Sequence, residues 1–270
     1  MALDTTEDGA ESIAIWEERA AERLLGETVY EHRLRLYAEI YAHDNAFWLH
    51  RHGRTGISGA TARNHALLQV ALPGDDPVLD IGGGTGVAGD AFSPTREYVI
   101  CDASPVEGAR SSPSFAKRRT VIGYATELPF PDATFGAVLM LDVLEHLHSD
   151  DIERCMVQVR RVLRPGGRLL IATPNRISGP WDSRRNLRDP YAHRGLHLNE
   201  MSAGDLLSLV RWHGFRALAF QTRQATAKLF DTRPLALWAG LWEGAAKSVP
   251  LRFRSRMCSL AVVLASKATG

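Results

Sequence analysis

This 270-residue sequence has few cysteines, no surplus of either charge and no apolar run long enough to span a membrane. The three cysteines, Cys101, Cys155 and Cys258, are too far apart for a disulfide framework or a metal-binding pattern. The 32 Lys and Arg residues balance 31 Asp and Glu residues, so no nucleic-acid partner is expected. The first residues also lack the basic and apolar regions of a signal peptide. Together these absences favour a cytoplasmic protein without a membrane span.

Short apolar runs of strand length alternate with helical patterns along most of the chain. The expected strands are 78–81, 98–101, 120–122, 136–141, 168–173, 215–221 and 259–265, and helices are expected at 149–163 and 202–212. The segment 164–167, Arg-Pro-Gly-Gly, is expected to form the turn between the first of these helices and the strand that follows it. Such alternation predicts an α/β fold, a doubly wound parallel sheet with helices on both faces.

Two regions depart from simple alternation. Residues 1–67 show helical patterns and are expected to form an N-terminal helical cover over a core at 68–270. Within the core, a polar loop at 175–200 is expected to hold the substrate, because loops at the carboxyl end of a parallel sheet do so. A tryptophan-containing helical insertion at 225–256, between the last two strands, is expected to form a lid or a dimer contact, with contact to a membrane surface as an alternative.

The most informative segment is a glycine-rich turn that follows the first strand of the alternation. Its spacing, Gly82-x-Gly84-x-Gly86, is tighter than the dinucleotide pattern G-x-G-x-x-G, and Asp80 stands before it. A carboxylate at this place would repel a pyrophosphate, whereas it suits a ligand with a cationic end. Asp102 ends the next strand, where an acidic side chain can accept hydrogen bonds from both ribose hydroxyls.

Three later segments, 123–132, 141–147 and 162–167, follow in the order that a doubly wound fold requires. With them, residues 72–265 resemble the class I S-adenosylmethionine-dependent methyltransferases, in the small-molecule branch called methyltransferase type 11. The resemblance implies a Rossmann-like seven-stranded sheet whose last strand is antiparallel, with S-adenosyl-L-methionine as the cofactor. It also implies a set of cofactor-binding residues, namely Asp80 at the methionine ammonium, Gly82, Gly84 and Gly86 beneath the ligand, Asp102 at the ribose, Ala103, Ala125 and Thr126 at the adenine, and Leu141 near the sulfonium. Tyr124 departs from the family pattern, in which many members have an Asp at this place.

Three histidines are candidates for a catalytic role. His146 follows the fourth strand at the cofactor end of the sheet, and His193 and His197 lie in the loop at 175–200. Histidine suits removal of a proton from a hydroxyl near neutral pH, although a helix-capping or supporting role is an equal alternative for His146. His146 and His148 form an H-x-H pair without a third ligand at recognisable spacing, so no metal is expected.

These features predict methyl transfer from S-adenosylmethionine to an oxygen, ahead of a nitrogen or a carbon. The expected acceptor is a small, partly apolar molecule of secondary metabolism, and the protein could act as a homodimer. Two alternatives are a nicotinamide-dependent oxidoreductase of the Rossmann type and a protein that binds S-adenosylmethionine without transferring a methyl group.

Overall fold

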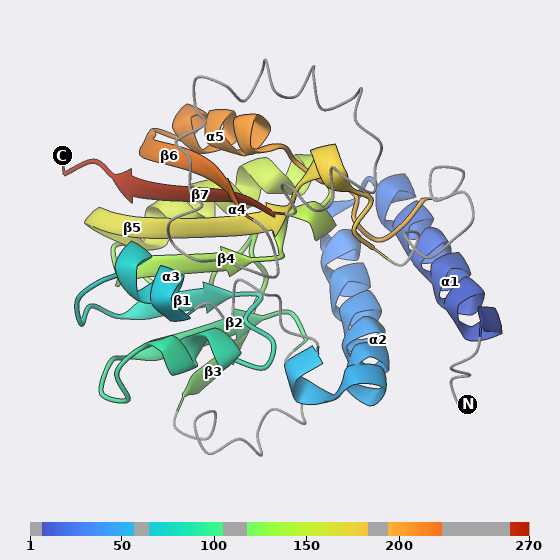
Figure 1. Cartoon of the computed structure of the whole chain (residues 1–270). Helices are drawn as coiled ribbons and strands as arrows, with labels where there is room; N and C mark the ends of the chain where they lie inside the picture. The colour runs from blue at the N-terminus through green and yellow to red at the C-terminus, as the bar shows by residue number, and fades with distance from the viewer. Residues whose placement is uncertain (1–6, 57–64, 105–117, 183–193, 223–259, 270) are drawn as a thin grey trace.

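The computed structural model describes residues 7–56, 65–104, 118–182, 194–222 and 260–269 (Figure 1). The insertion expected at 225–256 and the candidate His193 lie outside the described residues. Within the described residues, no helix is long and apolar enough to cross a membrane.

A seven-stranded sheet forms the centre of the molecule, in the order β3-β2-β1-β4-β5-β7-β6. The strands are β1 (Val78–Ile81), β2 (Tyr98–Asp102), β3 (Arg119–Ile122), β4 (Phe135–Leu141), β5 (Leu163–Pro174), β6 (Phe215–Thr222) and β7 (Leu260–Lys267). The strands β1 to β5 pair in parallel, whereas β7 is antiparallel to both of its neighbours, β5 and β6. This topology confirms the predicted fold class, including the antiparallel last strand.

The strand β5 begins five residues earlier than the sequence predicted, at Leu163 instead of residue 168. Leu163 pairs with Phe135 of β4, and the register then shifts before the regular pairing of Arg168 with Ala137. Gly166 has a positive φ of 77°, which glycine adopts without strain. The expected turn at 164–167 is therefore an irregular part of the strand and not a separate loop.

Helices pack on both faces of the sheet and produce two hydrophobic clusters. On one face lie α4 (Ser149–Val162) and α5 (Ala203–Trp212), whose buried side chains include Met156 and Leu206. On the other face lie α3 (His65–Ala71) and the short 3-10 helix η1 (Val87–Ala91), packed on residues such as Val78 and Leu139. Both faces of the central strands are thus buried, as expected for a parallel sheet.

The two N-terminal helices, α1 (Glu7–Gly26) and α2 (Tyr30–Gly56), lie beyond the carboxyl ends of β1 and β4 (Figure 1). Their buried side chains, including Leu24, Tyr37 and Ile40, join the same hydrophobic cluster as α4. Helices from the start of the chain therefore pack at the edge of the sheet where a doubly wound fold binds its ligand.

A buried ion pair joins α2 to the first turn of α4. The Arg33 guanidinium donates two hydrogen bonds to the Asp151 carboxylate, at 2.8 Å through Nε and 2.6 Å through Nη2. Tyr37 donates a third hydrogen bond to Asp151, at 2.8 Å, and its hydroxyl accepts one from the backbone N–H of His148. The side chains of Arg33 and Asp151 are 3% and 0% exposed, so each charge depends on the other for compensation.

Replacing Asp151 with asparagine should lower the free energy of unfolding by about 3–5 kcal/mol, because it leaves the Arg33 guanidinium buried without a counter-charge. Urea denaturation followed by circular dichroism measures this change. The matched control is Glu39→Gln, which breaks the exposed Arg23–Glu39 pair between α1 and α2 and should cost less than about 1 kcal/mol. Equal effects of the two substitutions would show that the buried pair does not anchor α2.

Candidate functional site

The glycine turn after β1 has a backbone conformation that glycine adopts most readily. Gly82, Gly84 and Gly86 all have a positive φ, of 67°, 48° and 69°. A Cβ atom on Gly82 would also lie only 2.6 Å from Cγ2 of Val143, which follows β4. The turn therefore packs directly against the segment after β4, so these glycines are needed for the shape of the turn itself.

A pocket of about 240 Å³ opens in front of this turn, at the carboxyl ends of β1, β2 and β4. Its walls include nine residues that the sequence marked as candidates, namely Asp80, Gly82, Gly84, Asp102, Ala103, Ala125, Thr126, Leu141 and His146. Gly86 is not among the lining residues; its N–H donates to the Gly83 carbonyl and its own carbonyl accepts from Arg118. Gly86 thus closes the turn behind the pocket wall.

Two backbone N–H groups hold the Asp102 carboxylate in the pocket wall. Gly84 donates to Oδ2 at 2.9 Å, and Ser104 donates to Oδ1 at 2.8 Å. Burial raises the pKa of Asp102, while these two hydrogen bonds act in the opposite direction. The carboxylate is therefore fixed in orientation, and each oxygen keeps a lone pair for a further donor.

Asp80 is a buried acid at the base of the same pocket, and no cationic side chain among the described residues is hydrogen-bonded to it. The Tyr98 hydroxyl donates to its Oδ2 at 2.5 Å. Burial raises the pKa of Asp80 to about 7 and the charge of Asp102 adds to this, whereas the Tyr98 hydrogen bond and the charge of Arg118 lower it. Two neighbouring buried carboxyls suit a ligand with a cationic end and several hydroxyl donors, as the methionine ammonium and the ribose of S-adenosylmethionine provide.

Side chains from α2 and from the loop after β3 complete the wall. Tyr37 and Tyr41 of α2 line the pocket together with Tyr124, the residue that departs from the family pattern. Tyr30, at the start of α2, donates a hydrogen bond of 2.9 Å to Oγ1 of Thr126. The helix α2 is thus attached to the rim of the pocket as well as to α4.

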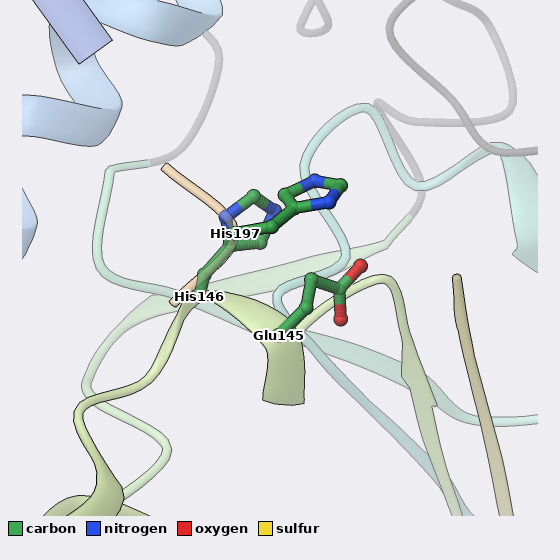
Figure 2. A group of neighbouring side chains, drawn as sticks. All are labelled: Glu145, His146 and His197. Carbon is green, nitrogen blue, oxygen red and sulfur yellow. The ribbon is translucent and has the colours of Figure 1, made fainter. Parts of the chain in front are cut away.

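His146 ends the 3-10 helix η4 (Leu144–His146), one turn after β4, and lines the pocket. The loop before α5 packs against η4, because Asn199 donates its backbone N–H to the Glu145 carbonyl at 2.9 Å. This packing brings His197 edge-on to His146, with ring centroids 4.8 Å apart (Figure 2). Two of the three candidate histidines therefore meet, although His197 is not among the residues that line the pocket.

The two imidazoles have opposite electrostatic surroundings. Burial, together with the neighbouring His197, lowers the pKa of His146 to about 3, so that its ring is neutral at pH 7. Burial would also lower the pKa of His197, but its Nδ1 lies 2.9 Å from Oε1 of Glu200, and this bond and the charge of Glu145 raise the pKa overall. Burial raises the pKa of the Glu145 carboxyl.

The sequence did not single out several residues of this site. The pocket is also lined by Thr85, Cys101, Asp142 and Val143. Glu145 lies beneath His146 (Figure 2), and the sequence had assigned it no role. The local sequence shows Glu145 only as an acidic residue directly after Leu144, an apolar residue that is buried in the structure. His148 is separate from this group, because its Nδ1 accepts from Asp150 at the start of α4.

Comparisons with known proteins agree with this geometry. Residues 79–171 match the family model of the methyltransferase domain. The chain is 32% identical to a probable S-adenosylmethionine-dependent methyltransferase of Mycolicibacterium smegmatis over 141 residues. This match covers 51% of this chain and 51% of that relative. Over 156 residues it is 31% identical to the O-methyltransferase resE of Aspergillus sclerotiorum, 53% of this chain and 56% of that relative.

The fold also matches a solved structure, the 1,6-didemethyltoxoflavin-N1-methyltransferase of Burkholderia thailandensis with bound 1,6-didemethyltoxoflavin and S-adenosylhomocysteine. The TM-score is 0.57 at 19% identity, covering 86% of this chain and 89% of that one. The chain spans about half the length of the curated relatives that it matches. The sheet topology, the matched methyltransferase domain at residues 79–171 and the named relatives together support the predicted resemblance to the class I S-adenosylmethionine-dependent methyltransferases, whose cofactor is S-adenosylmethionine.

Proposed function

We propose that this protein transfers the methyl group of S-adenosylmethionine to an oxygen atom of a small, partly apolar molecule. The observation that carries the proposal is a single pocket in which the glycine turn, two buried carboxyls and the imidazole of His146 meet. The names of the relatives support methyl transfer in general, to oxygen in one case and to nitrogen in another. Oxygen is favoured here because the neutral ring of His146 can accept a hydrogen bond from an acceptor hydroxyl in the pocket.

The cofactor would lie along the carboxyl ends of β1 and β2. Asp80 would face its ammonium group, Asp102 its ribose hydroxyls, and the backbone at Leu141 its sulfur. Ala103, Ala125 and Thr126 form the wall beside the expected adenine position, where Tyr124 would contribute a phenol in place of a carboxylate. Gly86 acts through the shape of the turn, since it lies behind this wall.

When bound, S-adenosylmethionine supplies a methyl group on a positively charged sulfur, and it is left as S-adenosylhomocysteine once the acceptor oxygen has gained the methyl group and lost its proton. The residues of this chain contribute position and exclusion of water. Tyr37 and Tyr41 close one side of the pocket, and His146 accepts a hydrogen bond from the acceptor's hydroxyl. Such positioning can supply a large part of the rate of an in-line displacement.

We also propose that residues 1–67 form a cover and that 175–200 contributes to acceptor binding. The supporting contacts are those of Tyr30 with Thr126 and of Asn199 with Glu145. The aromatic side chains of α2 favour an acceptor with apolar character, such as a molecule of secondary metabolism handled in the cytoplasm. His197 stands behind His146 and would act as a positioning residue.

Isothermal titration with S-adenosylhomocysteine tests the cofactor site. Asp102→Ala should weaken binding by about 10- to 100-fold, because it removes a charged acceptor from the ribose hydroxyls. Asp132→Ala is the matched control, since Asp132 is an exposed acid away from the pocket, and its affinity should equal that of the wild type. No binding to the wild type at millimolar ligand, or binding of NADH instead, would contradict the proposal.

The affinity for S-adenosylhomocysteine should depend on pH through Asp80. Its raised pKa of about 7 means that the free protein increasingly carries a neutral Asp80 below pH 7, and a neutral carboxyl does not attract an ammonium group. The affinity should therefore level off above about pH 8, and its fall should steepen below pH 7 toward about tenfold per pH unit at pH 5.5–6. Asp80→Asn should bind more weakly at pH 7.5 and lose this pH dependence; an unchanged pH profile in the variant would assign the titration to another group.

Removal of the His146 side chain should lower kcat by about 10²-fold or more while leaving the affinity for S-adenosylhomocysteine nearly unchanged. The measurement is release of S-adenosylhomocysteine with a panel of phenols, quinols and polyketide alcohols, for His146→Ala and the wild type. His148→Asn, which keeps an acceptor for the N–H of Asp150, is the control and should retain full turnover. Full turnover by His146→Ala would contradict a catalytic role for His146, and the rate would then depend on how the rest of the pocket positions the acceptor.

A further inference from the structure

We propose that Glu145, His146 and His197 bind a single divalent transition-metal ion of the zinc type beside the acceptor end of the pocket. One ligand atom from each of the three side chains lies within 4.8 Å of the other two. The residues come from two separate segments, η4 and the loop before α5, and their side chains gather in one place (Figure 2). Two imidazoles and one carboxylate are the ligand set of many catalytic zinc sites.

Each of the three side chains has its other polar atom held by a second group. His146 Nδ1 lies 3.4 Å from the Leu196 carbonyl, and His197 Nδ1 lies 2.9 Å from Oε1 of Glu200. Oε2 of Glu145 accepts a hydrogen bond of 2.9 Å from the Thr173 hydroxyl. Metal-binding histidines typically have a carbonyl or carboxylate at the other ring nitrogen, which orients the ring and selects its tautomer. The atoms that would bind the ion are then Nε2 of each imidazole and Oε1 of Glu145.

An unsatisfied buried oxygen provides an independent observation. Glu145 is 0% exposed, and its Oε1 has no hydrogen-bond partner among the described residues. A buried carboxyl oxygen without a hydrogen-bond partner is costly, because the bond that it made to water is not replaced. A cation held between this oxygen and the two imidazoles would remove the cost.

The geometry requires only small movements. Ligand atoms at 2.0–2.2 Å from a tetrahedral ion lie roughly 3.4 Å apart, so ligand atoms now within 4.8 Å of one another would approach by at most about 1.4 Å. Imidazole ligands favour zinc, cobalt or iron over magnesium and calcium, which prefer oxygen ligands alone. Three protein ligands also leave a fourth position open.

The role of the ion follows from the position of His146, the one member of the group that lines the pocket. With the ion on Nε2 of His146, the acceptor hydroxyl would bind the ion at its open position instead of donating a hydrogen bond to His146; there it would have a lowered pKa and would release its proton to solvent. The oxygen would then form its bond to the methyl carbon as the bond from that carbon to sulfur breaks. This role rests on the proposed methyl transfer, and it favours acceptors with a phenolic or enolic hydroxyl; the ion site itself rests on the geometry alone.

Cobalt(II) alone serves as the probe. The protein is treated with a chelator, dialysed, and titrated with CoCl2 while visible absorption and heat are recorded. The wild type should bind one Co²⁺ per chain and show the absorption of a nitrogen-coordinated ion, and ZnCl2 should displace it. Glu145→Gln and His197→Gln should each weaken binding by at least about tenfold. His148→Asn, the other histidine of the H-x-H pair, is the matched control and should bind as the wild type does.

Titration with S-adenosylhomocysteine accompanies each variant and shows whether its pocket is still folded. Absence of cobalt uptake by the wild type at about 0.1–1 mM CoCl2 would overturn the metal site. Uptake by folded Glu145→Gln and His197→Gln equal to that of the wild type would do the same. If S-adenosylhomocysteine binds but cobalt does not, the metal site is wrong and the proposed function stands. If cobalt binds at this group but S-adenosylhomocysteine does not, the metal site stands and the proposed function is wrong.

Discussion

The parallel pairing of β1 with β2 on one side and β4 on the other is the constraint on which the site depends. It brings the carboxyl ends of three strands to one edge of the sheet, and therefore brings together Asp80, Asp102 and Leu141. The chain leaves β1 and β4 on opposite faces, which opens a crevice between them. The tight contact of Gly82 with Val143 shows how closely the two connections approach at the base of that crevice.

Burial of acids at this edge links packing to chemistry. Asp80 and Glu145 both have raised pKa values because they are removed from water without full compensation by the protein. One faces the glycine turn and the other lies below His146, on the two sides of the β1–β4 crevice. Such groups are costly for the isolated fold and are explained most simply by ligands that bring positive charge. The two proposals, an ammonium at Asp80 and a metal ion at Glu145, apply the same physical argument to different groups.

The N-terminal helices connect stability to the pocket. Arg33 and Tyr37 hold the Asp151 carboxylate in the first turn of α4, and Tyr37 also contributes to the pocket wall. The same hydroxyl of Tyr37 accepts from the backbone of His148, close to His146. A change in the packing of α2 would therefore alter both the wall of the pocket and the start of α4, because the hydrogen bonds of Arg33 and Tyr37 to Asp151 connect them.

The sequence by itself determined the strand pattern, the glycine turn and the two acids that bracket it, because these features depend on local patterning and on residues at strand ends. It also indicated a ligand with a cationic end, since a carboxylate at Asp80 would repel a pyrophosphate, and the resemblance to a known family named the cofactor. Only the tertiary structure decided that Gly86 closes the turn behind the pocket wall, that β5 starts at Leu163, and that His197, and not His148, meets His146 beside Glu145. The physical reason is that these outcomes depend on how separate segments pack, as when Asn199 binds the backbone of Glu145, and such contacts leave no periodic signal in the sequence.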